Sequence, residues 1–143
     1  MDDEVRREAW SLQGPNRLVK VVAAGRAPAA RLGGFFTLGK FLLGKRCSQI
    51  ERGLGLPLNS LAMGARIYRF ARLPLRWEYE YELTAQYPDG LAFNPAHSDP
   101  SYPPGSAKIH QWSINDGVEL PVDPVNFLDL APGARFPYSW LVS

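Results

Sequence analysis

The sequence predicts an α+β fold in which short N-terminal helices precede a small antiparallel sheet and long proline-rich extended segments. Charge supports this division, because residues 1–76 carry a net charge of +9 and residues 77–143 carry −7. Nine of the 13 prolines follow residue 76, whereas nine of the 13 glycines precede it. Residues 77–84 alternate apolar and polar side chains with the period of a half-buried strand. We therefore divide the chain into a basic helical segment, 1–76, and an acidic segment, 77–143, that ends in an extended C-terminal arm.

Short amphipathic stretches between capping and breaking residues predict the helices of the basic segment. Asparagine or serine precedes several of them, and glycine or proline ends them. In the longest stretch, arginines at every third position form a basic stripe beside the apolar face. The expected helices cover Glu4–Leu12, Arg17–Ala24 and Leu61–Leu73, with a shorter one that starts at Ser48 and ends within about two turns.

An apolar stretch over residues 32–44 predicts a surface that meets a membrane interface or a partner. It contains four glycines and is flanked by basic residues. As a helix, its thirteen residues would span about 20 Å, which is less than the hydrocarbon core of a bilayer. A core helix weakened by glycines is the alternative, and the sequence favours neither. The expected membrane-interface residues are Phe35, Phe36, Lys40, Phe41, Lys45 and Arg46.

Strand and turn signals predict a small antiparallel sheet in the acidic segment. Over Trp77–Thr84, aromatic residues alternate with glutamates, which gives the strand an aromatic face and a carboxylate face. Asn115-Asp116-Gly117 is a strong hairpin signal between Ile109–Ile114 and Val118–Leu120. Repeated prolines in 94–106 and 121–143 exclude long regular elements there.

Three groups of side chains could form a catalytic or metal site, but each group is more readily explained by a structural role. A lone cysteine among basic residues is more often buried than nucleophilic. Glutamates along one strand face are more often solvated or paired than catalytic, and two histidines with one carboxylate make a weak metal site. The groups are Cys47; Glu78, Glu80 and Glu82; and His97, Asp99 and His110. We therefore expect no catalytic residue, metal, cofactor or small-molecule substrate, and the single cysteine excludes an internal disulfide.

Contacts with other proteins are expected along the C-terminal arm. Extended, proline-rich backbone with large aromatic side chains is costly to order alone, and it suits contact with neighbouring subunits. Glutamates between the aromatic residues argue against a nucleic acid partner, whereas the basic residues around the apolar stretch suit an anionic lipid surface. The expected partner-binding residues are Tyr102, Phe127, Phe136, Tyr138 and Trp140.

These features together predict a non-catalytic accessory subunit that stabilises a large membrane-associated assembly. The combination of moderate net charge and an interfacial apolar stretch favours a respiratory-chain or ATP-synthase complex, with the chain peripheral at the mitochondrial inner membrane. The acidic start, Met1–Glu4, is not that of a signal peptide or a matrix-targeting presequence, so any import signal is expected to be internal or already removed.

A second interpretation, that of an enzyme, rests on a resemblance. Three motifs are together loosely similar to small bacterial ADP-ribosyltransferase-like toxins: Ile67-Tyr-Arg-Phe70, Tyr87–Leu91 and Tyr102–Ser106. The resemblance implies an enzyme acting on NAD, in which Arg69 holds a phosphate of NAD, Ser106 lines the nicotinamide pocket and Glu119 is the catalytic carboxylate. It requires one concave site that holds Arg69 and Glu119 together, which the accessory-subunit prediction does not.

Overall fold

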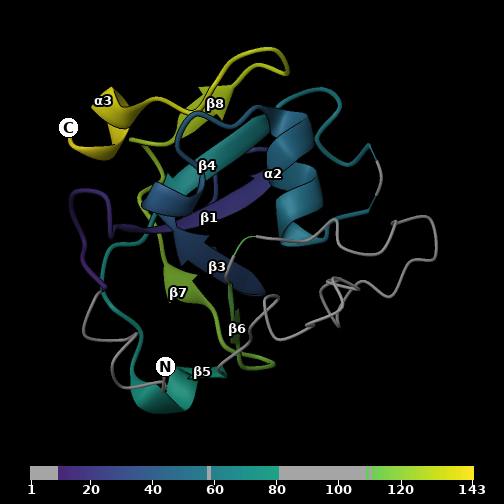
Figure 1. The fold of residues 1–143 in the computed structure, drawn as a ribbon. Coiled ribbons are helices and arrows are strands. Elements are labelled where there is room, and N and C mark those ends of the chain that lie inside the picture. Colours follow the sequence, from purple (N-terminus) through teal and green to yellow (C-terminus); the bar gives the residue numbers. More distant parts are fainter. Residues whose placement is uncertain (1–9, 58, 81–108, 110) are drawn as a thin grey trace, which may run out of the picture.

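The computed structural model describes residues 10–57, 59–80, 109 and 111–143, which fold mostly as β-structure (Figure 1). The strands of this part are β1 (Leu18–Ala23), β2 (Arg31–Leu32), β3 (Phe35–Leu38), β4 (Ala65–Arg69), β5 (Tyr79–Glu80), β6 (Trp112–Ile114), β7 (Leu120–Pro121) and β8 (Leu128–Leu130). Its helices are α2 (Cys47–Leu54) and α3 (Tyr138–Leu141), with the 3-10 turns η1 (Gly39–Phe41) and η2 (Arg76–Glu78). The prediction of an α+β fold with short N-terminal helices is wrong, because the described part of the basic segment forms the strands β1–β4 and one α-helix, α2.

Six strands form one antiparallel sheet in the order β5-β6-β3-β1-β4-β8, and β2 pairs separately with β7. At the centre, β1 pairs with β4 from Val19 opposite Arg69 to Ala23 opposite Ala65. An isolated bridge between Phe70 and Val122 joins the continuations of β4 and β7. The structure therefore curls, because the segment around β7 contacts β2 on one side and the end of β4 on the other.

The turn that begins at Asn115 is a bulge, not the predicted hairpin. The Val118 N–H donates to the Asn115 carbonyl oxygen, as in a turn. However, β6 pairs antiparallel with β3, and β7 pairs antiparallel with β2. Gly33-Gly34 connects β2 to β3, so these two strands form one bent segment. Strands β6 and β7 both pair with that segment and run in the same direction along it. The pairing partner, which is distant in sequence, thus overrides the local hairpin signal.

The predicted helices over Arg17–Ala24 and Leu61–Leu73 are wrong, because these stretches contain β1 and β4. In β1, the successive side chains of Leu18 and Val19 are both fully buried, in clusters on opposite faces of the sheet. A strand that is covered on both faces has no strict alternation of apolar and polar residues. A short apolar run of this kind does not distinguish a strand from a helix by its periodicity.

Two hydrophobic clusters lie on the two faces of the sheet. On one face, Ile50 and Leu54 of α2 and Leu141 of α3 belong to one cluster with residues of the central strands. Figure 1 shows α2 beside β1 and β4. On the other face the cluster is aromatic, and the Trp10 ring meets the rings of Phe36, Tyr79 and Trp112 edge to face at centroid distances of 5.0–5.4 Å. The described residues therefore supply a hydrophobic core of their own.

The helix α2 confirms the prediction of a short helix near Ser48. It begins one residue earlier, and the Gln49 side-chain oxygen accepts a hydrogen bond from the Arg46 N–H at 2.9 Å. It ends at Gly55, whose φ of 70° is the left-handed conformation that favours glycine. In the described part of the chain, no helix is long and apolar enough to cross a membrane.

Candidate functional site

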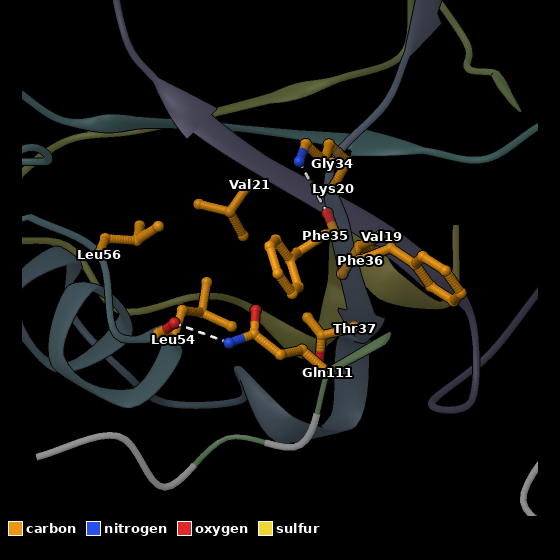
Figure 2. A pocket seen from close by; sticks show the side chains of 10 residues that line it. All are labelled: Val19, Lys20, Val21, Gly34, Phe35, Phe36, Thr37, Leu54, Leu56 and Gln111. Carbon is orange, nitrogen blue, oxygen red and sulfur yellow. Dashed lines mark hydrogen bonds between the residues drawn. The ribbon is translucent and has the colours of Figure 1, made fainter. Parts of the chain in front are cut away.

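A cleft opens where β1 and β3 diverge. The pairing of the two strands ends at Val19 opposite Thr37. Beyond this pair, β1 continues beside β4, whereas β3 turns toward β6. The gap between them is a cavity of about 270 Å³. Its lining residues, shown in Figure 2, are Val19, Lys20, Val21, Gly34, Phe35, Phe36, Thr37, Leu54, Leu56 and Gln111.

Lys20 supplies the positive charge at one end of this cleft. Its Nζ donates a hydrogen bond to the Phe35 carbonyl oxygen at 2.8 Å, which links the two diverging strands. Gly34 makes room for the amine, because a Cβ at that position would lie 2.8 Å from Nζ. Burial lowers the pKa of Lys20 to about 8. An ammonium group has three protons to donate, so this contact leaves Lys20 two donors for a ligand.

Gln111 supplies a hydrogen-bond acceptor at the other end of the cleft. Its side chain is buried, with 1% of the residue exposed, and Nε2 donates to the Leu54 carbonyl oxygen at 2.7 Å. That bond fixes the orientation of the amide, so Oε1 points into the cleft (Figure 2). The hydrogen bond to Leu54 uses Nε2 and leaves Oε1 as an acceptor at the cleft. An oriented acceptor beside apolar walls can accept a hydrogen bond from a ligand.

The walls between these two polar ends are apolar. Val21 and Phe35 project between Lys20 and Gln111 in Figure 2, and Leu54 and Leu56 line the left side of the cleft in that view. An apolar cavity with a few convergent polar groups is the usual form of a small-molecule site. The cleft therefore suits a small, flat or branched apolar ligand with an anionic or carbonyl group at one end and a hydrogen-bond donor at the other.

The residues of the ADP-ribosyltransferase resemblance do not meet in one described cavity. Arg69 lies on β4, not on the expected helix, and lines a hollow with Arg17 and Asp123. Glu119 lines a different hollow, beside the bulge that follows β6. Ser106 lies outside the described residues. Arg69 and Glu119 thus line different hollows of the described part of the chain, and the resemblance stays a prediction.

Cys47 is placed as a structural residue. The side chain is 1% exposed, and Sγ donates to the Leu130 carbonyl oxygen at 3.5 Å. Burial raises the pKa of this thiol, which disfavours the nucleophilic thiolate. The three proposed metal ligands, His97, Asp99 and His110, lie outside the described residues. The described residues contain no cluster of potential metal ligands.

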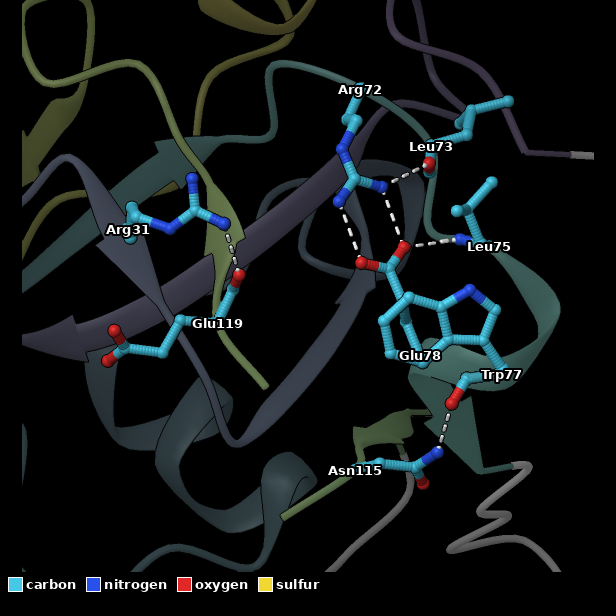
Figure 3. A network of polar contacts seen from close by, with 8 residues as sticks. All are labelled: Arg31, Arg72, Leu73, Leu75, Trp77, Glu78, Asn115 and Glu119. Carbon is cyan, nitrogen blue, oxygen red and sulfur yellow. Dashed lines mark hydrogen bonds and ion pairs between the residues drawn. The ribbon is translucent and has the colours of Figure 1, made fainter. Parts of the chain in front are cut away.

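The two faces expected over Trp77–Thr84 are not formed at Trp77 and Glu78. Glu78 is buried and Trp77 is 65% exposed, in the turn η2 that precedes β5. Figure 3 shows the cause: Arg72 Nη1 and Nη2 each donate to the Glu78 carboxylate at 2.7 Å, and the Leu75 N–H donates to it as well. Glu78 is thus a structural anchor, while Glu82 and the side chain of Glu80 lie outside what is described.

The residues predicted to meet a membrane or a partner are divided between core and surface. Of the membrane-interface set, Phe36 is buried, Phe35 lines the cleft, Phe41 and Lys45 are half-buried, and Lys40 and Arg46 are exposed. Of the partner-binding set, Phe136 is buried, Phe127 and Trp140 are half-buried, Tyr138 is exposed, and Tyr102 lies outside the described residues. Contact with lipid or with other subunits through the exposed members stays a prediction.

No protein-family model, curated protein or solved structure matches this chain. The functional argument therefore rests on the cleft and its side chains. Sequence reasoning missed both polar residues of the cleft. The available signal was Lys20, a lone charge inside the run Leu18–Ala23, whereas the position of Gln111 depends on contacts with α2 that leave no local pattern.

Proposed function

We propose that this protein binds a small aromatic or branched carboxylate that also carries a hydroxyl or amide N–H, in the cleft between β1 and β3. The carboxylate contacts the Lys20 ammonium, and the ligand's donor contacts Gln111 Oε1. The apolar body lies against Val21, Phe35 and Leu56. This proposal departs from the expectation that the chain has no small-molecule ligand.

The observation that carries the proposal is that a half-buried amine and an oriented amide oxygen face one apolar cavity from its two ends. Both groups keep hydrogen-bonding capacity that faces the cavity. A carboxylate at Lys20 forms a charge-assisted hydrogen bond, and a hydroxyl at Gln111 donates to the amide oxygen. The apolar walls add hydrophobic burial but little specificity.

Isothermal titration calorimetry with benzoate and 4-hydroxybenzoate tests both contacts. We expect 4-hydroxybenzoate to bind the wild-type chain more tightly than benzoate does. Lys20→Met keeps the length of the side chain and removes its charge, so it should weaken both ligands by about tenfold or more. Gln111→Met should abolish only the advantage of 4-hydroxybenzoate.

Lys40→Met is the matched control, because Lys40 is exposed on η1 and does not line the cleft. Its affinities should equal those of the wild-type chain. Equal affinities for Lys20→Met and Lys40→Met, with both variants folded by circular dichroism, would contradict the proposal. So would the absence of heat exchange with either ligand.

The accessory-subunit prediction, with its location at the mitochondrial inner membrane, is kept as a second proposal. It is supported by the exposed apolar side chains of Leu75 and Trp77, which are close in sequence and are 50% and 65% exposed. Exposed apolar patches are typical of protein or membrane contacts. The test is the thermal melt of the isolated full chain with and without anionic vesicles. A cooperative melt that lipid leaves unchanged would contradict it.

A further inference from the structure

A second hollow, of about 450 Å³, lies at the other end of β1 and shares no lining residue with the cleft. Two arginines line it: Arg17, which directly precedes β1, and Arg69 at the end of β4. The remaining lining residues are Leu12, Phe70, Ala71, Val122, Asp123 and Pro124. The hollow thus combines two guanidinium groups and one carboxylate with an apolar wall.

The guanidinium group of Arg17 is enclosed and lacks compensation. Arg17 is only 7% exposed, and its Nε and Nη1 atoms have no hydrogen-bond partner among the described residues. Arginine stays protonated in proteins, so the charge is retained after burial. An unpaired buried charge is strongly unfavourable, and such groups usually bind an ion or a partner. Arg17 is therefore poised for an anion.

Arg69 is held in place beside Arg17. Its Nη2 donates to the Trp140 carbonyl oxygen and to the Ser143 hydroxyl oxygen, and its Cζ lies 4.3 Å from the centre of the Trp140 ring. Its Nε is buried and has no partner in the described part of the chain. Burial lowers the pKa of both arginines, and the charge of Arg17 lowers that of Arg69 further. An anion between them would relieve this repulsion.

Asp123 fills that role only in part, because its charge raises the pKa of Arg69 without forming a hydrogen bond to it in the described part of the chain. Its carboxylate accepts hydrogen bonds from the N–H groups of Val125 and Asn126 and from the Asn126 side chain, at 2.9–3.0 Å. These bonds lower the pKa of Asp123 and commit it to its own turn. With two guanidinium groups and one carboxylate, the hollow keeps a net positive charge.

We propose that Arg17 and Arg69 bind the phosphate group of a small phosphorylated molecule in this hollow. Two guanidinium groups offer several donors in fixed forks, which suits the tetrahedral phosphate oxygens. The apolar wall formed by Phe70, Val122 and Pro124 leaves contact surface for the organic part of the ligand. The site uses Arg69 without Glu119, so it does not depend on the ADP-ribosyltransferase resemblance, and it is independent of the carboxylate cleft.

Calorimetric titration of the full chain with inorganic phosphate and with phenyl phosphate, at constant ionic strength, tests the proposal. The wild-type chain should bind phenyl phosphate about tenfold more tightly than inorganic phosphate. Equal affinities would indicate that the ligand is free phosphate, and they would overturn the proposal of a phosphorylated organic molecule. Binding of neither would overturn all of it.

Variants separate the site from general attraction of anions to a basic surface. Arg17→Met should abolish binding, whereas Arg52→Met, which removes an exposed arginine of α2, should leave the affinity unchanged. Equal losses in the two variants would overturn the site. The Nε–Hε resonances of Arg17 and Arg69 in the wild-type chain provide a measurement that needs no variant. They should shift on addition of phenyl phosphate, and unchanged resonances would contradict the proposal.

Discussion

Glu78 and Arg17 are two buried charges that the fold treats in opposite ways. Glu78, 3% exposed, accepts hydrogen bonds from Arg72 and from the Leu75 N–H, all at 2.7 Å (Figure 3). Arg17, 7% exposed, keeps two nitrogens without a partner among the described residues. Burial alone therefore does not separate structure from function. A compensated charge stabilises a turn, whereas an uncompensated charge indicates a binding site.

The largest effect is expected from removing the compensation of Glu78. Arg72→Ala leaves a carboxylate in a buried position, with the Leu75 N–H as its one remaining donor in the described part of the chain. Since Arg72 itself is 40% exposed, we expect a loss of about 2–3 kcal/mol in the free energy of unfolding, somewhat below the value for a fully buried pair. Urea denaturation followed by Trp fluorescence measures it.

Arg52→Ala is the control, because Arg52 is an exposed arginine on α2. Its effect should be clearly smaller than that of Arg72→Ala. If the two variants lose the same free energy, Glu78 is not anchored by Arg72, and the contrast with Arg17 fails.

The pH dependence of stability is the next effect in size. The hydrogen bonds from Arg72 lower the pKa of Glu78 to about 2. The folded chain thus holds this proton less tightly than the unfolded chain, so the stabilisation is complete above the unfolded pKa of about 4.3 and is lost as the pH falls toward 2. The difference in unfolding free energy between wild type and Glu78→Gln should shrink from about 1–2 kcal/mol to near zero over that range. A constant difference between pH 7 and pH 2 would show that the charge of Glu78 is not what stabilises the turn.

Local hydrogen bonding explains which element the sequence predicts correctly. The helix α2 has its own signals, since Gln49 bonds back to Arg46 and Gly55 ends the helix. These contacts lie within one short stretch, so a pattern in the sequence reports them. By contrast, β1 and β4 owe their form to pairing with each other across more than forty residues, which no local pattern records.

The functional residues escape prediction for the same reason. The cleft exists because β3 pairs with β1 only as far as Val19 and Thr37. Beyond this point β3 pairs with β6, which is distant in sequence. The lack of a partner for Arg17 depends on what the whole fold brings near it. The sequence shows an arginine before an apolar run, but whether its charge is compensated is a property of the folded chain.

Removing the uncompensated charge should stabilise the protein. In buffer without phosphate, Arg17→Met replaces an unpaired buried guanidinium with an apolar side chain of similar length, and we expect the free energy of unfolding to rise by about 1 kcal/mol. Arg52→Met should leave the unfolding free energy nearly unchanged, because Arg52 is exposed. A loss of stability in Arg17→Met would mean that the Arg17 guanidinium has a stabilising partner in solution. Arg17 and Glu78 would then both be paired buried charges, and the contrast between them would be wrong.

Lys20 is intermediate between these two charges, because it has one hydrogen bond and remains half-buried, and it gives the smallest expected effect. Burial lowers its pKa to about 8 in the folded chain. Between pH 8 and the unfolded pKa of about 10.4, the unfolded chain binds more protons than the folded one, so stability rises with pH. Relative to Lys20→Met, the wild-type chain should gain about 0.5–1 kcal/mol over this interval, a value reduced by partial hydration of the amine. Thermal melts at matched pH measure the gain, with Lys40→Met as the control that should show none. A flat difference across the interval would mean that Lys20 is as well hydrated as a surface lysine, and the cleft would then lack the desolvated amine on which carboxylate binding depends.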